Sequence, residues 1–160
     1  MISKTDSKSN PTPGLPDQVS GNPPATVLVV DDQESNRLLL CDQLEARGYT
    51  SIEAADGEEA LEKAATDPPD VILLDIMMPA LNGFDVCRRL KANPKLAHVP
   101  IIIVTALNQH REQRLAMEAG ANDFLAKPVD VADLIFRVCS AIRSKRLLEH
   151  HQQELLRKAS

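Results

Sequence analysis

The chain has 160 residues, of which 43% are hydrophobic and 26% are charged, and its formal net charge is -5. This length suits one ordinary domain with tails, and the composition is that of a globular protein. The apolar runs are too short to cross a bilayer, the acidic balance argues against nucleic acid as a partner, and three scattered cysteines indicate neither disulfides nor a zinc site.

The first segment, residues 1–24, is rich in Ser, Pro, Asn and Lys and has almost no large apolar residues. Such a composition buries too little apolar surface to fold, so we expect a disordered leader. The segment also lacks the apolar core of a secretory signal, which makes the cytoplasm the expected compartment and a membrane contact unexpected.

After the leader, short apolar runs alternate with segments of helical spacing, which is typical of βαβ units. Strands are predicted at residues 27–30, 51–54, 71–74, 101–105 and 123–126, and helices at residues 34–47, 57–65, 84–92, 109–119 and 131–157. Three of the strands are continuous in Val, Ile and Leu, as central strands covered on both faces are. The pattern predicts an α/β fold, a doubly wound five-stranded parallel sheet with helices on both faces.

Polar side chains stand where four of these predicted strands end: Asp31 and Asp32, Asp75, Thr105, and Lys127. The carboxyl ends of parallel strands meet at one edge of the sheet, where such folds bind their ligands. A single aspartate there often just caps the next helix, but the combination favours a functional site. Three carboxylates suit Mg²⁺, while the ammonium and hydroxyl groups suit a phosphoryl group that one carboxylate attacks as the nucleophile.

Four motifs carry a family resemblance: VLVVDD at 27–32, VILLDIMMPALNG at 71–83, PIIIVTA at 100–106 and DFLAKP at 123–128. In this order and spacing they closely resemble the receiver domain of two-component response regulators. The resemblance covers about residues 25–146 and implies the flavodoxin-like receiver fold, with strand order 2-1-3-4-5 and, here, an extended C-terminal helix. The domain division that follows is a leader (1–24), a receiver domain (25–146) and a helical extension or linker (147–160).

The same resemblance implies a role for each aspartate of the predicted site. Asp75 is the implied phosphoacceptor. Asp31, Asp32 and Asp75, together with the backbone carbonyl of Met77, are the implied Mg²⁺ ligands. Asn82 departs from the family, which more often has Asp before the glycine of this loop, and we expect little effect from it.

Three further residues receive roles from the resemblance. Lys127 is the lysine that contacts the phosphoryl group, and Thr105 is the switch hydroxyl. Phe124 stands where the family has an aromatic side chain that rotates inward on phosphorylation. The bond between Lys127 and Pro128 is expected to be cis, an isomer that is accessible to prolyl bonds.

The implied function is to accept a phosphoryl group from the phosphohistidine of a sensor histidine kinase or phosphotransfer protein. The domain would hydrolyse its acyl phosphate slowly, act on no other substrate, and switch the surface made by the fourth helix, fifth strand and fifth helix. Kinase specificity would be read mainly from residues 36–44. The alternatives are a degenerate receiver that acts as a scaffold and an aspartyl-nucleophile phosphatase, which typically has a second Asp where Met77 stands.

The last predicted helix continues beyond the length that a receiver needs. Ala141, Leu148 and Leu155 are at heptad spacing, with Lys145 and Gln152 between them, which is compatible with a thin coiled coil or with a solvated tail. We expect homodimerisation through this helix and the switch surface. Two interpretations stay open: a single-domain regulator, or a receiver whose helix leads to an effector domain or protein.

Overall fold

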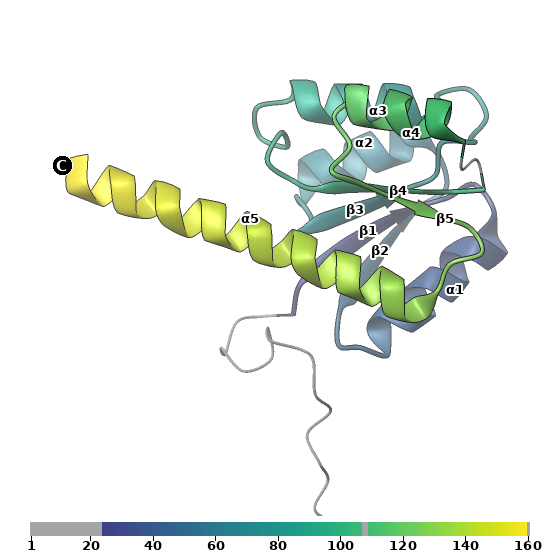
Figure 1. Cartoon of the computed structure of the whole chain (residues 1–160), viewed down its shortest axis with the longest axis horizontal. Helices are drawn as coiled ribbons and strands as arrows, with labels where there is room; N and C mark the ends of the chain where they lie inside the picture. Colours follow the sequence, from purple (N-terminus) through teal and green to yellow (C-terminus); the bar gives the residue numbers. More distant parts are fainter. Residues whose placement is uncertain (1–23, 107–108, 160) are drawn as a thin grey trace, which may run out of the picture.

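The computed structural model describes residues 24–106 and 109–159. In this part, five parallel strands form one sheet in the order β2-β1-β3-β4-β5, which confirms the predicted topology (Figure 1). The strands are β1 (Thr26–Val30), β2 (Thr50–Ala54), β3 (Val71–Leu74), β4 (Ile101–Thr105) and β5 (Asp123–Ala126). The helices are α1 (Glu34–Glu45), α2 (Gly57–Thr66), α3 (Gly83–Ala92), α4 (His110–Glu118) and α5 (Val131–Ala159). Almost all of the predicted leader lies outside the described residues.

Predicted and observed boundaries differ by at most two residues. The largest differences are at the ends of helices. α1 ends at Glu45, two residues before its predicted end, and α5 ends at Ala159, two residues after its predicted end. Gly48 follows α1 with a φ of 90°, a conformation that glycine adopts without steric cost. The glycine therefore marks the turn after α1.

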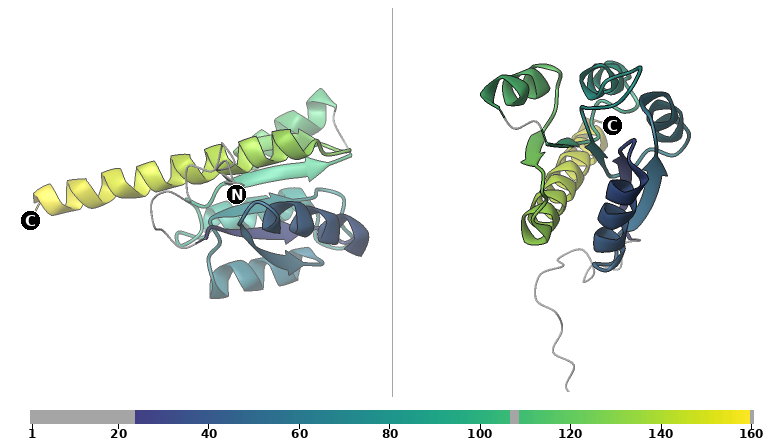
Figure 2. Two further views of the ribbon diagram at one scale, coloured as in Figure 1. Left: turned by 90° about the horizontal axis from the view of Figure 1, so that it is seen from below. Right: turned by 90° about the vertical axis from the view of Figure 1, so that its right-hand side faces the viewer.

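Helices cover both faces of the sheet, as Figures 1 and 2 show. On one face α1 and α5 pack against β1, β3 and β4 in a cluster that includes Val29, Leu44, Leu73 and Val138. On the other face α2, α3 and α4 pack in a second cluster. The central strands β1, β3 and β4 are buried nearly throughout, because helices exclude water from both of their sides.

Helices α2 and α3 each begin with a side-chain cap, at the edge of the sheet where the strands have their carboxyl ends. Asp56 accepts a hydrogen bond from the Glu59 amide (2.8 Å), and Asn82 accepts one from the Asp85 amide (3.0 Å). Each bond satisfies one of the free N–H groups of a first helical turn. The departure at Asn82 therefore keeps the local structure, because Asn caps a helix about as well as Asp.

The last helix, α5, runs back along the sheet and then projects beyond it, at the end opposite the carboxyl ends of the strands (Figure 2). Lys145 is where α5 leaves the sheet: its Nζ lies 3.4 Å from Asp70 and 2.9 Å from Glu149. Farther along, Leu147, Leu148, Leu155 and Leu156 are between 54% and 73% exposed. Within residues 24–106 and 109–159, no helix has the length and apolar character that a membrane span requires.

Thiol reactivity tests the packing of α3 against the sheet. Cys87 is fully buried on α3, and burial raises the pKa of its thiol to about 11, whereas Cys139 is partly exposed. Because the thiolate is the nucleophile and a raised pKa keeps the thiol protonated, alkylation of the native protein at pH 8 should modify Cys139 first and leave Cys87 unmodified. Intact-mass and peptide analysis over time checks this; fast labelling of Cys87 in folded protein would contradict the packing.

Candidate functional site

The carboxyl ends of the strands bring together the side chains that the sequence predicted for this edge. Val30 of β1 is paired with Leu74 of β3, so the residues that follow, Asp31 and Asp75, are neighbours. The Asp75 amide donates to the Val30 carbonyl (3.0 Å), which continues the strand pairing up to the aspartate. Both side chains are buried: Asp31 is 1% exposed and Asp75 is 7% exposed. Two adjacent carboxylates taken out of water require a cation to stabilise them.

Lys127 supplies that positive charge from the end of β5. Its Nζ lies 2.7 Å from Asp31 Oδ2 and 2.9 Å from Asp75 Oδ2. Burial by itself lowers the pKa of Lys127, but the hydrogen bonds to the two aspartates outweigh burial and raise the pKa above that of a free lysine. The lysine is therefore an ammonium ion that bridges two buried carboxylates.

Backbone amides hold the second oxygen of each buried carboxylate. Asp31 Oδ1 accepts from the Gln33 amide (2.9 Å), and Asp75 Oδ1 accepts from the Met77 amide (3.0 Å). With one oxygen on an amide and the other on Lys127, both side chains are fixed before any ligand binds. Such a preorganised site does not spend binding energy on orienting its ligating groups.

The third carboxylate, Asp32, is exposed and completes an acidic group at the rim. One carboxylate oxygen from each of Asp31, Asp32 and Asp75 can be chosen so that the three atoms lie within 4.8 Å of one another. Mg²⁺ takes oxygen ligands and usually keeps several waters, so three carboxylates with an open side toward solvent fit this ion. The fourth ligand implied by the resemblance, the Met77 carbonyl, stays a prediction.

Replacing Asp32 with Asn tests this acidic group. Because the metal-free group holds three like charges, the substitution should raise the Tm of the metal-free protein by about 2–4 °C and remove the stabilisation that added Mg²⁺ gives. Thermal melts with Mg²⁺ and with a chelator measure both effects. A lower metal-free Tm together with intact Mg²⁺ stabilisation would contradict the role assigned to Asp32.

Thr105 and Phe124 lie on the neighbouring strands β4 and β5. Thr105 ends β4, is fully buried and accepts a hydrogen bond from the Lys127 amide through its backbone carbonyl (2.9 Å). Phe124 is paired with Ile103 and is partly buried against the cluster on the α2–α4 face. Phe124 thus lies on the strand that leads to Lys127, and Thr105 ends the neighbouring strand. Their switch roles stay predictions. The Lys127–Pro128 bond is cis, as the resemblance implied.

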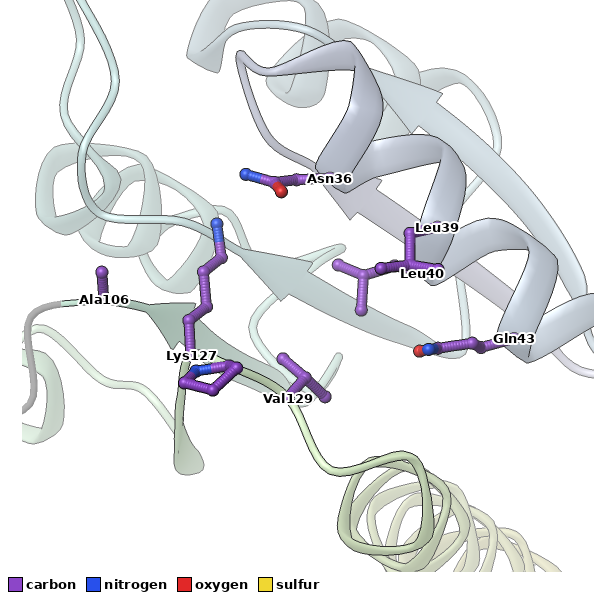
Figure 3. Close-up of a pocket in the computed structure, with 8 residues that line it drawn as sticks. Asn36, Leu39, Leu40, Gln43, Ala106, Lys127 and Val129 are labelled. Atoms are coloured by element: carbon purple, nitrogen blue, oxygen red, sulfur yellow. The ribbon is translucent and has the colours of Figure 1, made fainter.

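A groove beside the lysine was not foreseen as a cavity from the sequence. It has a volume of about 460 Å³ and lies between α1 and the segment after β5 (Figure 3). Its lining residues are Asn36, Leu39, Leu40, Gln43, Ala106, Lys127, Pro128 and Val129. The sequence contains one sign of this groove, because α1 has three consecutive leucines and a helix does not bury three consecutive side chains on a single face. In the structure, Leu39 is 58% exposed.

Comparisons with known proteins agree with this geometry. A family model described as Response regulator receiver domain matches residues 27–139. The response regulator PleD of Caulobacter vibrioides is 46% identical over 129 residues, which make up 81% of this chain and 28% of that relative. The chain spans about half or less of the length of the first curated relatives that it matches.

Solved structures give the same result. A putative response regulator from Chloroflexus aurantiacus J-10-fl has a TM-score of 0.73 at 35% identity, covering 75% of this chain and 98% of that chain. The receiver domain of a sensor histidine kinase from Pseudomonas aeruginosa PAO1 has a TM-score of 0.70 at 32% identity, covering 74% and 98%. That structure has a magnesium ion coordinated in its active-site cleft.

Proposed function

The chain belongs to the response regulator receiver domain family of two-component signalling, and on this premise we propose that Asp75 accepts a phosphoryl group from the phosphohistidine of a histidine kinase or phosphotransfer protein. The observation that carries the proposal is the bridge that Lys127 forms between Asp31 and Asp75 at the strand ends. It brings the proposed acceptor carboxylate next to a fixed ammonium ion, with the exposed Asp32 carboxylate at the same edge of the sheet.

The residues of the site divide the work of the transfer. A carboxylate oxygen of Asp75 forms the new O–P bond as the P–N bond to the donor histidine breaks, and the bonding electrons return to the imidazole. Lys127 is already within 2.9 Å of Asp75 Oδ2, so it neutralises charge on the incoming phosphoryl group without a large movement. Thr105 donates its hydroxyl to a phosphoryl oxygen after transfer. Asp31, Asp32, Asp75 and the Met77 carbonyl would hold Mg²⁺, which would supply further neutralisation of that charge.

The groove beside Lys127 is the proposed contact for the phosphodonor. Its wall from α1 combines the apolar Leu39 and Leu40 with the polar Asn36 and Gln43, and it faces Lys127, Pro128 and Val129 (Figure 3). A helix that carries the phosphohistidine would pack there and leave its imidazole above the acidic group. Kinase specificity, assigned to residues 36–44 from the resemblance, would then be read by side chains of this wall.

Output is proposed to lie in a surface rather than in turnover. Phosphorylation would shift an existing equilibrium of the α4-β5-α5 face through Thr105 and Phe124, and slow hydrolysis of the acyl phosphate would reset it. The four exposed leucines of the projecting α5 support homodimerisation through this helix, because water-exposed leucines at this density favour burial against a partner. An effector protein or domain would read the resulting change.

The test is intact-mass spectrometry after incubation of the full chain with a small-molecule phosphodonor, with Mg²⁺ or with a chelator, and size measurement of the same samples. A single phosphoryl adduct that depends on Mg²⁺ is expected, together with a shift toward dimer. No adduct on folded protein would refute phosphoryl transfer and favour the scaffold alternative. A stable adduct-free protein that turns over phosphate esters would instead favour the phosphatase.

A further inference from the structure

The three acidic side chains of the site are restrained very unequally. Asp31 and Asp75 each have one oxygen on a backbone amide and the other on Lys127. The Asp32 carboxylate, in contrast, is exposed and makes no hydrogen bond within the described part of the chain. Its location is therefore set by its own backbone, and in particular by the peptide group that joins it to Asp31.

That peptide group is held by Arg37, one turn into α1. Arg37 Nη1 donates to the backbone carbonyl of Asp31 (2.9 Å), and Arg37 Nε donates to Glu53 Oε1 on β2 (2.9 Å). The Arg37 side chain is only 14% exposed, so its guanidinium is enclosed between α1 and the sheet. On the other side of the same residue, the Asp31 amide donates to the Ala54 carbonyl (3.2 Å). Both backbone polar groups of Asp31 are thus bonded.

The planar guanidinium directs its N–H groups in fixed directions, so a bond to Glu53 with Nε also fixes where Nη1 points. A carbonyl that accepts from such a donor does not rotate freely, and the Asp32 Cα and Cβ that follow it are placed with it. We propose that Arg37 is a positioning residue of the metal site, which places the Asp32 carboxylate through the Asp31 carbonyl. The inference rests on the proposed function, because the site is the proposed Mg²⁺ site.

Charge and position predict opposite effects of removing Arg37. Arg37 is a cation beside an acidic group, so by Coulomb's law alone its removal would strengthen the binding of a second cation. If Arg37 instead positions Asp32, its removal weakens binding, because Mg²⁺ requires near-octahedral oxygen geometry and tolerates displaced ligands poorly. Losing a group that orients a metal ligand typically lowers affinity by about 10- to 100-fold.

The experiment is a calorimetric Mg²⁺ titration of the full chain, with circular-dichroism melts to confirm that every variant is folded at the titration temperature. For Arg37→Ala we expect the Kd to rise about tenfold. Arg37→Lys, which keeps the charge but has one donor nitrogen in place of the planar fork, should lie between Arg37→Ala and the wild type. The matched control Arg88→Ala removes an arginine and its ion pair with Asp85 on α3 and should leave the Kd unchanged.

Glu53→Gln separates the carbonyl contact from the ion pair. Gln keeps an acceptor for Arg37 Nε and leaves the bond from Nη1 to Asp31 in place, so the loss of affinity should be smaller than for Arg37→Ala. Equal losses would assign the effect to the ion pair and overturn the inference. Unchanged or tighter binding by Arg37→Ala would also overturn it, while the proposed function stands. Absence of binding by the wild type would refute the proposed metal site, and the inference with it.

Discussion

Asp75→Asn is expected to abolish the phosphoryl adduct completely, because an amide oxygen does not replace the carboxylate as a nucleophile toward phosphorus. The substitution preserves the size of the side chain and its acceptor for the Met77 amide, and Lys127 keeps Asp31 as a partner. The fold should therefore survive, and removal of one of three clustered carboxylates should not lower the Tm of the metal-free protein. Intact-mass spectrometry with the phosphodonor and Mg²⁺ measures the loss.

Asp56→Asn is the matched control for this substitution. Asp56 lies at the start of α2, where it caps the helix, and Asn caps about as well as Asp, so adduct formation should be that of the wild type. A phosphoryl adduct that persists on Asp75→Asn would place the acceptor elsewhere, and peptide mapping would then identify it. That outcome would refute the central assignment of the site.

Gly83→Ala is expected to lower the stability of the protein more than any other substitution that adds a single methyl group near the site. A Cβ at position 83 would clash with the Asp75 carbonyl oxygen and would lie only 2.6 Å from the Ile76 Cα. Both atoms belong to the backbone of the loop that carries the acceptor, so the clash is relieved only if the loop or α3 moves. Overpacking of this kind typically costs about 1–3 kcal/mol. Because Asp75 moves with its loop, adduct formation should slow at least tenfold.

Gly57→Ala offers a close comparison, since Gly57 is also the first residue of a helix after a capping side chain. A Cβ there would meet the side chains of Val86, at 2.7 Å, and Leu81, at 3.0 Å, rather than backbone. Side chains yield more easily, and Ala also favours the helix, so a smaller loss of stability and normal adduct formation are expected. Thermal melts and adduct rates that are equal for the two variants would contradict the constraint at Gly83.

The proposed site and the projecting helix lie at opposite ends of the molecule. The acidic group occupies the carboxyl ends of the strands, whereas α5 leaves the sheet near Lys145 and Asp70, beyond the amino ends (Figures 1 and 2). A change at Asp75 that reaches the exposed leucines would have to be carried by the body of α5, which packs against the sheet. This separation suits a receiver that transmits a change of state along one continuous helix.

The sequence by itself determined the order and kind of the elements and the composition of the site. Continuous Val, Ile and Leu runs indicated three buried strands, and polar residues at the ends of the predicted strands, such as Asp31, Asp75 and Lys127, were assigned to one edge. The physical reason is that hydrophobic periodicity is local, and parallel strands necessarily bring their carboxyl ends to the same side of a sheet. The family motifs then supplied roles that periodicity does not contain.

Only the tertiary structure decided which groups touch. Lys127 reaches Asp31 and Asp75 across 96 and 52 positions of sequence, and no local pattern encodes such distances. The same holds for the Arg37 contact with the Asp31 carbonyl and for the approach of Gly83 to the acceptor loop. These contacts depend, to within an ångström, on how the helices pack against the sheet. Side-chain volumes across the whole core jointly determine that packing.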